Sequence, residues 1–359
     1  GGKFETPIDA AWGGKQFAFS TLNSKDFRQL IVSREKPRTS SFRIDVSMDF
    51  DRVRKTLVDD PSISTEAPHE IYMFGTNGAP GIARMRGDTF DVISSTLMPN
   101  AAVIDPGSGV RGKDNFFCTD MANDQIQKWS IDVTSLQLVY GGLGTGSTSF
   151  SIPNYMALDE EEDLLWIADA NNNRVKIHSS DNFAFVGSFG SLGSGATNLH
   201  MPTDVHIDKD NAFLADDGNN RITVLDKITR EVVRSIPLSR NTVSETAMEG
   251  DSDSLYVGYN HVPHNGFEYQ EVVLEKLRKS DGALMQRVVI QPKDEVILAS
   301  ASIRGDLAIS GPFIYITFTP DVNSNERFFL QKLLRSDLSL VSQQERDLPH
   351  YGVTGDASA

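Results

Sequence analysis

Five polar residues of this chain have side chains that could act together in binding or catalysis: His69, Asn100, Asn154, Thr203 and His206. Imidazole nitrogens and side-chain oxygens can ligate a cation, and imidazole can also accept a proton from a substrate. Four of the five, His69, Asn100, Asn154 and Thr203, directly follow a proline. If these positions are equivalent, their side chains meet wherever the four segments converge. The set is therefore a candidate ligand-binding site.

The short motifs that identify common active sites are missing from the sequence, among them Gly-x-Ser-x-Gly, His-Glu-x-x-His and Cys-x-x-Cys. Two glycine runs, 141–146 and 190–195, superficially resemble phosphate-binding loops. No helix is predicted after either run, so both are interpreted as turns between sheets. A catalytic triad can be assembled from residues far apart in sequence, but the sequence nominates none.

An internal repeat supplies the elements that would position these residues. The first copy comprises Pro153–Asp159, Leu165–Asp169 and Asn173–Ile177, and the second comprises Pro202–Asp208, Phe213–Asp216 and Asn220–Val224. The two prolines are 49 positions apart, and the Asp-Arg pairs of the two copies are offset by 47. A third, weaker copy runs from Pro99–Asp105 to Phe116–Asp120. Periods of about 40–50 residues filled with short strands are typical of a β-propeller or a related array.

The repeat resembles the NHL repeat over about residues 99–236, because an apolar strand ending in Ala-Asp is followed by Asn-Arg in both full copies. The resemblance implies that each unit is one blade, with an inner strand after the proline and a second strand ending at the aspartate. We expect its motif residues to be structural, the aspartates accepting N–H groups in turns and the arginine stems covering apolar surface. These residues are Asp120, Asp169, Asn173, Arg174, Asp216, Asn220 and Arg221.

Pairs of strand-like segments recur along the chain and predict one central hairpin for each blade. They lie at 17–32, 71–86, 116–130, 165–178, 213–225, 255–277 and 313–334. Seven blades in 359 residues give about 51 residues per blade, which is close to the repeat offset. We therefore predict an all-β fold, a single β-propeller domain of residues 1–359 with four-stranded blades. Seven blades are predicted, and six are the alternative if the N-terminal strands complete the last blade.

One helix is expected, as an insertion at about 47–60 between the first and second blades. Ser47 is a suitable N-cap, and Phe50, Val53 and Leu57 follow at three- and four-residue spacing. We interpret this segment as an inter-blade insertion, with a lid over one mouth of the propeller as the alternative.

The repeat also resembles, in part, the peptidylglycine amidating lyases, a resemblance that implies histidine-bound zinc near the propeller axis. In this chain asparagine or threonine follows the repeat prolines, so that ligand pattern is not reproduced. Some six-bladed lactonases hold calcium at the axis, for which Asn100 and Asn154 would be candidates. We predict no metal and no cofactor, with calcium or zinc at the axis as the alternative.

Two functions remain open at this point. The first is a non-enzymatic binding or scaffold propeller for a protein or glycan partner, with the loop His261–Tyr269 as a candidate rim. The second is an enzyme of the lactonase, hydrolase or lyase type in the axial funnel. The first is our prediction because the blade signatures come without a catalytic motif.

The amino-acid composition limits the classes of molecule that this protein is expected to bind. The formal net charge is −15 and the pI is near 4.9, which opposes binding to nucleic-acid phosphates. The only cysteine, Cys118, cannot form an intrachain disulfide, and no run of about 20 apolar residues predicts insertion into a membrane. The sequence starts Gly1-Gly2 without methionine, so we expect a processed, secreted or extracytoplasmic protein rather than a cytoplasmic one.

Overall fold

The strands of the protein form six β-sheets in the part of the chain that the computed structural model describes. The described residues are 26–27, 33–34, 52–56, 69–76, 80–86, 92–97, 106–131, 134–242, 244–262, 271–290, 302–310, 312–319 and 327–347. Five of the sheets contain four consecutive antiparallel strands each, and the first has two short additional strands. The predicted all-β fold with four-stranded units is confirmed.

Each sheet is built from strands that follow one another along the chain. The first sheet comprises β1 (Asp26–Phe27), β2 (Ser33–Arg34), β3 (Arg52–Thr56), β4 (His69–Thr76), β5 (Pro80–Arg86) and β6 (Val92–Leu97). The second comprises β7 (Pro106–Arg111), β8 (Asn115–Asp120), β9 (Gln125–Ser130) and β10 (Leu136–Gly141). The third comprises β11 (Pro153–Asp159), β12 (Leu164–Asp169), β13 (Arg174–Ser179) and β14 (Phe185–Phe189).

The remaining sheets continue in the same way. The fourth comprises β15 (Pro202–Ile207), β16 (Asn211–Asp216), β17 (Arg221–Asp226) and β18 (Val232–Pro237). The fifth comprises β19 (Ser244–Gly250), β20 (Ser254–His261), β21 (Glu271–Arg278) and β22 (Leu284–Ile290). The sixth comprises β23 (Ser302–Ser310), β24 (Phe313–Thr319), β25 (Arg327–Leu334) and β26 (Leu340–Asp347). Single-turn 3₁₀ helices follow β12 (η2, Ala170–Asn172) and β16 (η3, Asp217–Asn219).

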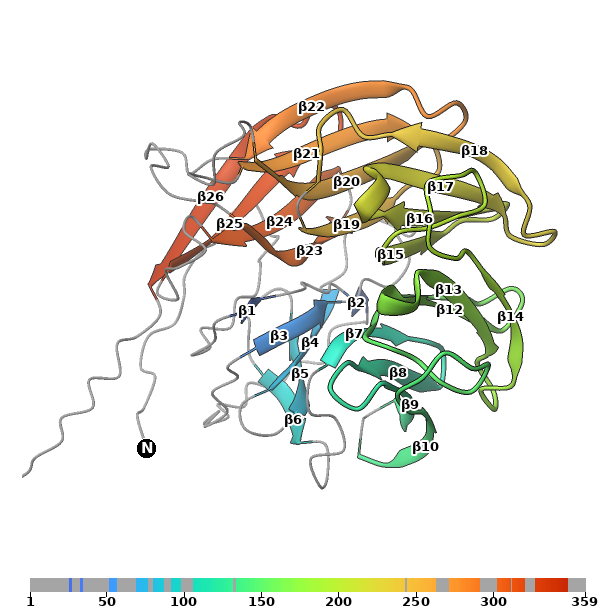
Figure 1. Cartoon of the computed structure of the whole chain (residues 1–359). Coiled ribbons are helices and arrows are strands. Elements are labelled where there is room, and N and C mark those ends of the chain that lie inside the picture. The colour runs from blue at the N-terminus through green and yellow to red at the C-terminus, as the bar shows by residue number, and fades with distance from the viewer. Residues whose placement is uncertain are drawn as a thin grey trace, which may run out of the picture.

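The first strand of each four-stranded unit lies nearest the centre of the molecule. These inner strands, β3, β7, β11, β15, β19 and β23, each contact the next, and β23 in turn contacts β3. Figure 1 shows the sheets side by side around a common centre, with β10, β14, β18 and β22 at the periphery. The predicted hairpin at 17–32 lies almost entirely outside the described residues, so the choice between seven and six blades stays a prediction, as does the single domain of residues 1–359.

The expected helix near residue 50 is wrong, because residues Arg52–Thr56 form strand β3. β3 pairs antiparallel with β4 and parallel with β1, and it also contacts the inner strands on both sides. Pairing with two strands and contacts with two more outweigh a local helical spacing of apolar residues, because helix propensity is a weak term beside tertiary contacts. No helix long and apolar enough to span a bilayer occurs among the described residues.

The third copy of the repeat begins seven residues later than the sequence suggested. Its inner strand β7 starts at Pro106, which is paired with Asp120. This is the pairing that the other repeat prolines make with Asp169 and Asp216. The expected start at Pro99 is therefore wrong, because the proline that opens an inner strand is defined by its register with the aspartate of the second strand.

The apolar core lies between neighbouring sheets. Between the third and fourth sheets, for example, Trp166 and Ile177 from one side pack with Val205 and Leu214 from the other, and all four are buried. Full burial of such side chains contributes roughly 1.5–3 kcal/mol each. Cys118 is buried in the second sheet, and burial raises the pKa of its thiol. The core thus follows the apolar strands on which the repeat was recognised.

Candidate functional site

The predicted axial residues lie at several different places in the fold. Asn154 and Thr203 are buried on the inner strands β11 and β15. His206 is at the opposite end of β15, and His69 is the first residue of β4, the second strand of the four-stranded unit β3–β6. Asn100 lies outside the described residues. In the second sheet the residue after the repeat proline is Gly107, so Asn100 does not occupy the position equivalent to Asn154 and Thr203.

Asn154 and Thr203 lie where the inner strands are irregular. The register shifts between Pro153 and Met156 and, at the same repeat position, between Pro202 and Val205. Such β-bulges turn side chains out of the regular alternation. The Thr119 hydroxyl donates to the Asn154 carbonyl oxygen (2.9 Å), and the Thr203 hydroxyl donates to the carbonyl oxygen of Thr246 (3.5 Å). Both residues thus take part in linking consecutive sheets.

Two buried carboxylates, those of Asp204 and Asp217, lie near these residues. An Asp204 oxygen accepts the backbone N–H of Met248 (2.8 Å), and an Asp217 oxygen accepts that of Thr246 (3.2 Å). Both bonds end on β19, where they satisfy N–H groups of an inner strand. In the sequence, these two aspartates are marked by their positions, because Asp204 directly follows Thr203 and Asp217 directly follows Asp216. Among the described residues, no three or more His, Cys, Asp or Glu side chains are placed to hold a metal ion together.

The aspartate and arginine of the repeat bind the loop that enters their own sheet. Asp169 is fully buried and accepts the backbone N–H of Ser151 (2.7 Å) and the Nε–H of Arg174 (2.8 Å). Arg174 then donates to the carbonyl oxygens of Thr145 (2.7 Å) and Gly146 (3.0 Å). One buried ion pair therefore fixes the backbone of the loop 142–152.

The next sheet repeats this network. Asp216 accepts the backbone N–H of His200 (2.7 Å) and the Nε–H of Arg221 (2.7 Å), and Arg221 donates to carbonyl oxygens of Gly195 and Asn198. The loop 190–201 is held as firmly as its counterpart. In the weaker second sheet, Asp120 accepts the backbone N–H of Ala122, and Gln125 stands opposite it where the other copies have arginine. That substitution is visible in the sequence.

The repeat contains two adjacent asparagines with different roles. Asn173 and Asn220 each adopt the left-handed conformation with φ of 54°, and each accepts a backbone N–H from the loop that enters the following sheet. Asparagine tolerates this conformation better than most residues. Asn172 and Asn219, which the sequence reading passed over, donate to the motif aspartates and to the loop carbonyls of Gly144 and Gly193.

The two fixed loops expose apolar side chains at matching positions. We call the end of the ring formed by loops 142–152 and 190–201 and by turns 170–173 and 217–220 the loop face. On it, Leu143 is 78% exposed and its counterpart Leu192 67%, while Ile152 and its counterpart Met201 are 41% and 49% exposed. These loops carry no Asp, Glu, Lys or Arg residue. A neutral apolar surface therefore recurs across consecutive sheets.

The opposite end, the turn face, comprises turns 160–163, 208–210, 227–231, 251–253 and 279–283. There the buried Lys227 binds Asp159 (3.0 Å) and Glu161 (2.9 Å) of the preceding sheet. Burial acts to lower the pKa of Lys227, but its hydrogen bonds to the two carboxylates outweigh that effect and raise the pKa. The ion pair joins two consecutive sheets through residues that are 68 positions apart in sequence.

The same link occurs twice more at equivalent positions. Lys279 contacts Asp208 (3.3 Å) and Nε2 of His206 (3.0 Å), and Arg335 binds Asp251. A side chain at Gly250 would collide with His206 and with the end of Lys279, so glycine permits this approach. We call the three links Asp159–Lys227, Asp208–Lys279 and Asp251–Arg335 the inter-sheet clasps. His206, expected near the axis, is therefore part of a clasp at the turn face.

A buried basic pair lies between the second and third sheets. The Lys176 amino group donates to the carbonyl oxygens of Ser147 (2.5 Å) and Ser149 (3.1 Å) and lies 4.0 Å from the centre of the Phe150 ring. Burial, with Arg174 nearby, lowers the pKa of Lys176 to about 8. Burial likewise lowers the pKa of His178 to about 4. Both groups contribute to the rigidity of the loop 142–152 and its neighbours.

His178 makes stability depend on pH. Its folded-state pKa of about 4 lies below the value of about 6.5 expected for unfolded chain, so acid favours the unfolded state. As pH falls from 6.5 to 4 we expect this group to remove up to about 3 kcal/mol of unfolding free energy. Urea unfolding across this range, compared with His178→Phe, measures it. An unchanged pH slope in the variant would contradict the assignment.

Comparisons with known proteins identify the fold but not a family. No family model matches the chain, and no curated protein matches it. Among solved structures, one described as "Structure of U3-55K" has a TM-score of 0.51 at 8% identity, over 76% of this chain and 77% of that one. The Kuenenia stuttgartiensis hydrazine synthase has a TM-score of 0.48 at 15% identity, over 67% of this chain and 68% of that one. The sheets, the ring of inner strands and the likeness to the first of these structures together show that the chain has a β-propeller fold.

Proposed function

We propose that this protein is a non-enzymatic binding propeller of NHL-like blades that holds a protein partner on its loop face. The observation that carries the proposal is the recurrence of exposed Leu143 and Leu192, with Ile152 and Met201, on loops whose backbones are fixed. Apolar side chains at protein–protein interfaces contribute most when they are presented by a rigid surface, because little conformational entropy is then lost on binding.

A protein partner fits this surface better than a glycan. The exposed anchors are aliphatic, and the only Phe, Tyr or Trp residue in the two loops, Phe150, is fully buried. The loops contain no Asp, Glu, Lys or Arg, and the guanidinium groups of Arg174 and Arg221 already donate hydrogen bonds to loop carbonyl oxygens. A partner with an apolar contact surface is therefore complementary, whereas a nucleic acid would need free basic groups.

Photocrosslinking tests the proposal directly. A photoreactive amino acid is placed at Leu143 or Leu192 in the native host, and at Ile228 as the control. Ile228 is 62% exposed but lies on the turn face, so it matches the test positions in exposure and not in location. We expect one discrete protein adduct from positions 143 and 192 and none from 228. The absence of adducts from both loop positions, or equal labelling from 228, would overturn the proposal.

A further inference from the structure

A pocket of about 580 Å³ lies on the turn face between the fourth and fifth sheets. It is enclosed by the turn before β16, the turn before β20, the turn after β21, and the outer strands β18 and β22. Its lining residues are Asp208, Asp210, Asn211, Arg234, Ser252, Asp253, Ser254, Arg278, Lys279, Ser280 and Met285. Its size is in the range of small-molecule sites.

The floor of this pocket is rigid. Lys279 is buried, its backbone N–H donates to the carbonyl oxygen of Asp253 (2.9 Å), and its amino group is held by Asp208 and His206. Arg234 donates from below to the carbonyl oxygen of Lys279. The clasp thus joins the two sheets that line the pocket and fixes the position of its walls.

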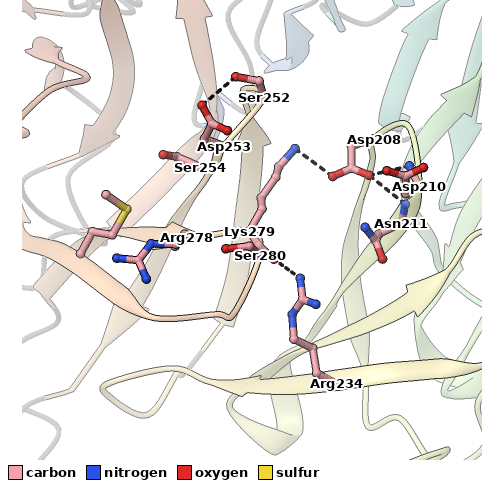
Figure 2. Close-up of a pocket in the computed structure, with 11 residues that line it drawn as sticks. Asp208, Asp210, Asn211, Arg234, Ser252, Asp253, Ser254, Arg278, Lys279 and Ser280 are labelled. Atoms are coloured by element: carbon pink, nitrogen blue, oxygen red, sulfur yellow. Dashed lines mark hydrogen bonds and ion pairs between the residues drawn. The ribbon is translucent and has the colours of Figure 1, made fainter.

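Acidic and basic side chains lie near different ends of Lys279. Figure 2 shows Asp253 and Asp208 on either side of the Lys279 amino group, with Asp210 beyond Asp208, and the guanidinium groups of Arg278 and Arg234 nearer the backbone of Lys279. The lining carries three carboxylates and three cations, so neither a simple anion nor a simple cation is favoured throughout the pocket.

Several of these groups retain hydrogen-bonding capacity. Among the described residues, the carboxylate of Asp210 and the side-chain amide of Asn211 have no hydrogen-bond partner. On the basic side, Nε of Arg234 is buried without a partner, and Arg278 makes one bond through Nη1 to Asp281 (2.7 Å). A buried donor without a partner costs about 1–3 kcal/mol, which a ligand acceptor would recover.

We propose that this pocket binds a small zwitterion of the amino-acid type, a free α-amino acid or a dipeptide. Its ammonium group lies beside the carboxylate of Asp210, and its carboxylate accepts hydrogen bonds from Arg278 and Arg234. An apolar side chain of the ligand lies against Met285, which is 45% exposed on the pocket wall. Charge-assisted hydrogen bonds at both ends fix the orientation of the ligand. This site is independent of the loop face, on which the proposed partner binds.

Calorimetric titration tests this site. The purified chain is screened with the twenty common L-amino acids and with Leu-Leu, and the best ligand is compared with its N-acetyl and its carboxamide forms. We expect Kd below about 1 mM for the zwitterion. Each charge-deleted form should bind at least about tenfold more weakly. A free amino acid that binds more tightly than Leu-Leu identifies the source as a monomer, and the reverse order identifies a dipeptide.

Variants distinguish this pocket from other sites. Asp210→Asn and Arg278→Gln should each weaken binding by at least about tenfold, because each removes one of the recognising charges. Lys209→Gln and Glu162→Gln change exposed charges on the same face that do not line the pocket, so they should leave affinity unchanged. The proposal fails if no probe binds, or if Asp210→Asn and Arg278→Gln bind like the controls. All four positions are at the surface, so loss of folding does not confound the result.

Discussion

Replacement of Asp216 by alanine lowers the free energy of unfolding by about 3–5 kcal/mol, the usual cost of removing one partner of a buried ion pair. The Asp216 carboxylate is fully buried and accepts hydrogen bonds from His200, Asn219 and Arg221. Without it, Arg221 keeps its charge but loses its counter-ion, and the N–H of His200 has no acceptor. Urea denaturation of wild type and variant measures the change.

The matched control for this variant is Asp210→Ala. It removes a carboxylate from the same sheet, but one that is exposed and whose side chain has no described partner, so we expect a change within about 0.5 kcal/mol. A double variant with Arg221→Ala should cost less than the sum of the single variants, because the two residues share one interaction. A loss below about 1 kcal/mol for Asp216→Ala would show that the motif does not fix the loop 190–201.

The double variant Leu143→Asp with Leu192→Asp is expected to weaken partner binding by at least about 100-fold, equivalent to about 2.7 kcal/mol. Two apolar anchors are lost, and two carboxylates would have to be desolvated in the interface. Surface plasmon resonance with the crosslinked partner, once purified, measures the affinity.

The fold of this variant should be unaffected, because Leu143 and Leu192 are mostly exposed and substitution at exposed positions rarely changes stability by more than about 0.5 kcal/mol. Ile228→Asp is the control for a new charge on an exposed turn, and we expect it to bind normally. Wild-type affinity in the double variant would place the partner elsewhere on the propeller.

The fold could be predicted from the sequence because the repeat units follow one another at a nearly constant spacing. Six of the seven predicted hairpins coincide with antiparallel strand pairs, from β4–β5 through to β24–β25. The errors arose where the spacing is irregular. The residues after Pro99 resemble those after the other repeat prolines, so the sequence predicts that the third copy begins there. Only the pairing of Pro106 with Asp120 identifies the proline that opens the inner strand.

The sites were less predictable than the fold. The inter-sheet clasps join residues such as Asp159 and Lys227, which are 68 positions apart. Asp159 and Asp208 recur at the end of the first segment of each repeat copy, but the sequence does not show which cation each of them binds. A single sequence shows which residues recur, but the partner of each recurring charge depends on how the sheets stack in space. The pocket could not be predicted for the same reason, because its two walls come from different repeats.

The clasps and the arginine networks also have a consequence for motion. Between the third and fourth sheets, Asp159–Lys227 joins one end of the interface, while Asn173 and Arg221 secure the loop at the other end. A sheet fastened at both ends to its neighbour has no hinge about which to rock. Binding at one end of the ring therefore does not change the shape of the other end, and two ligands on opposite ends should bind with additive free energies.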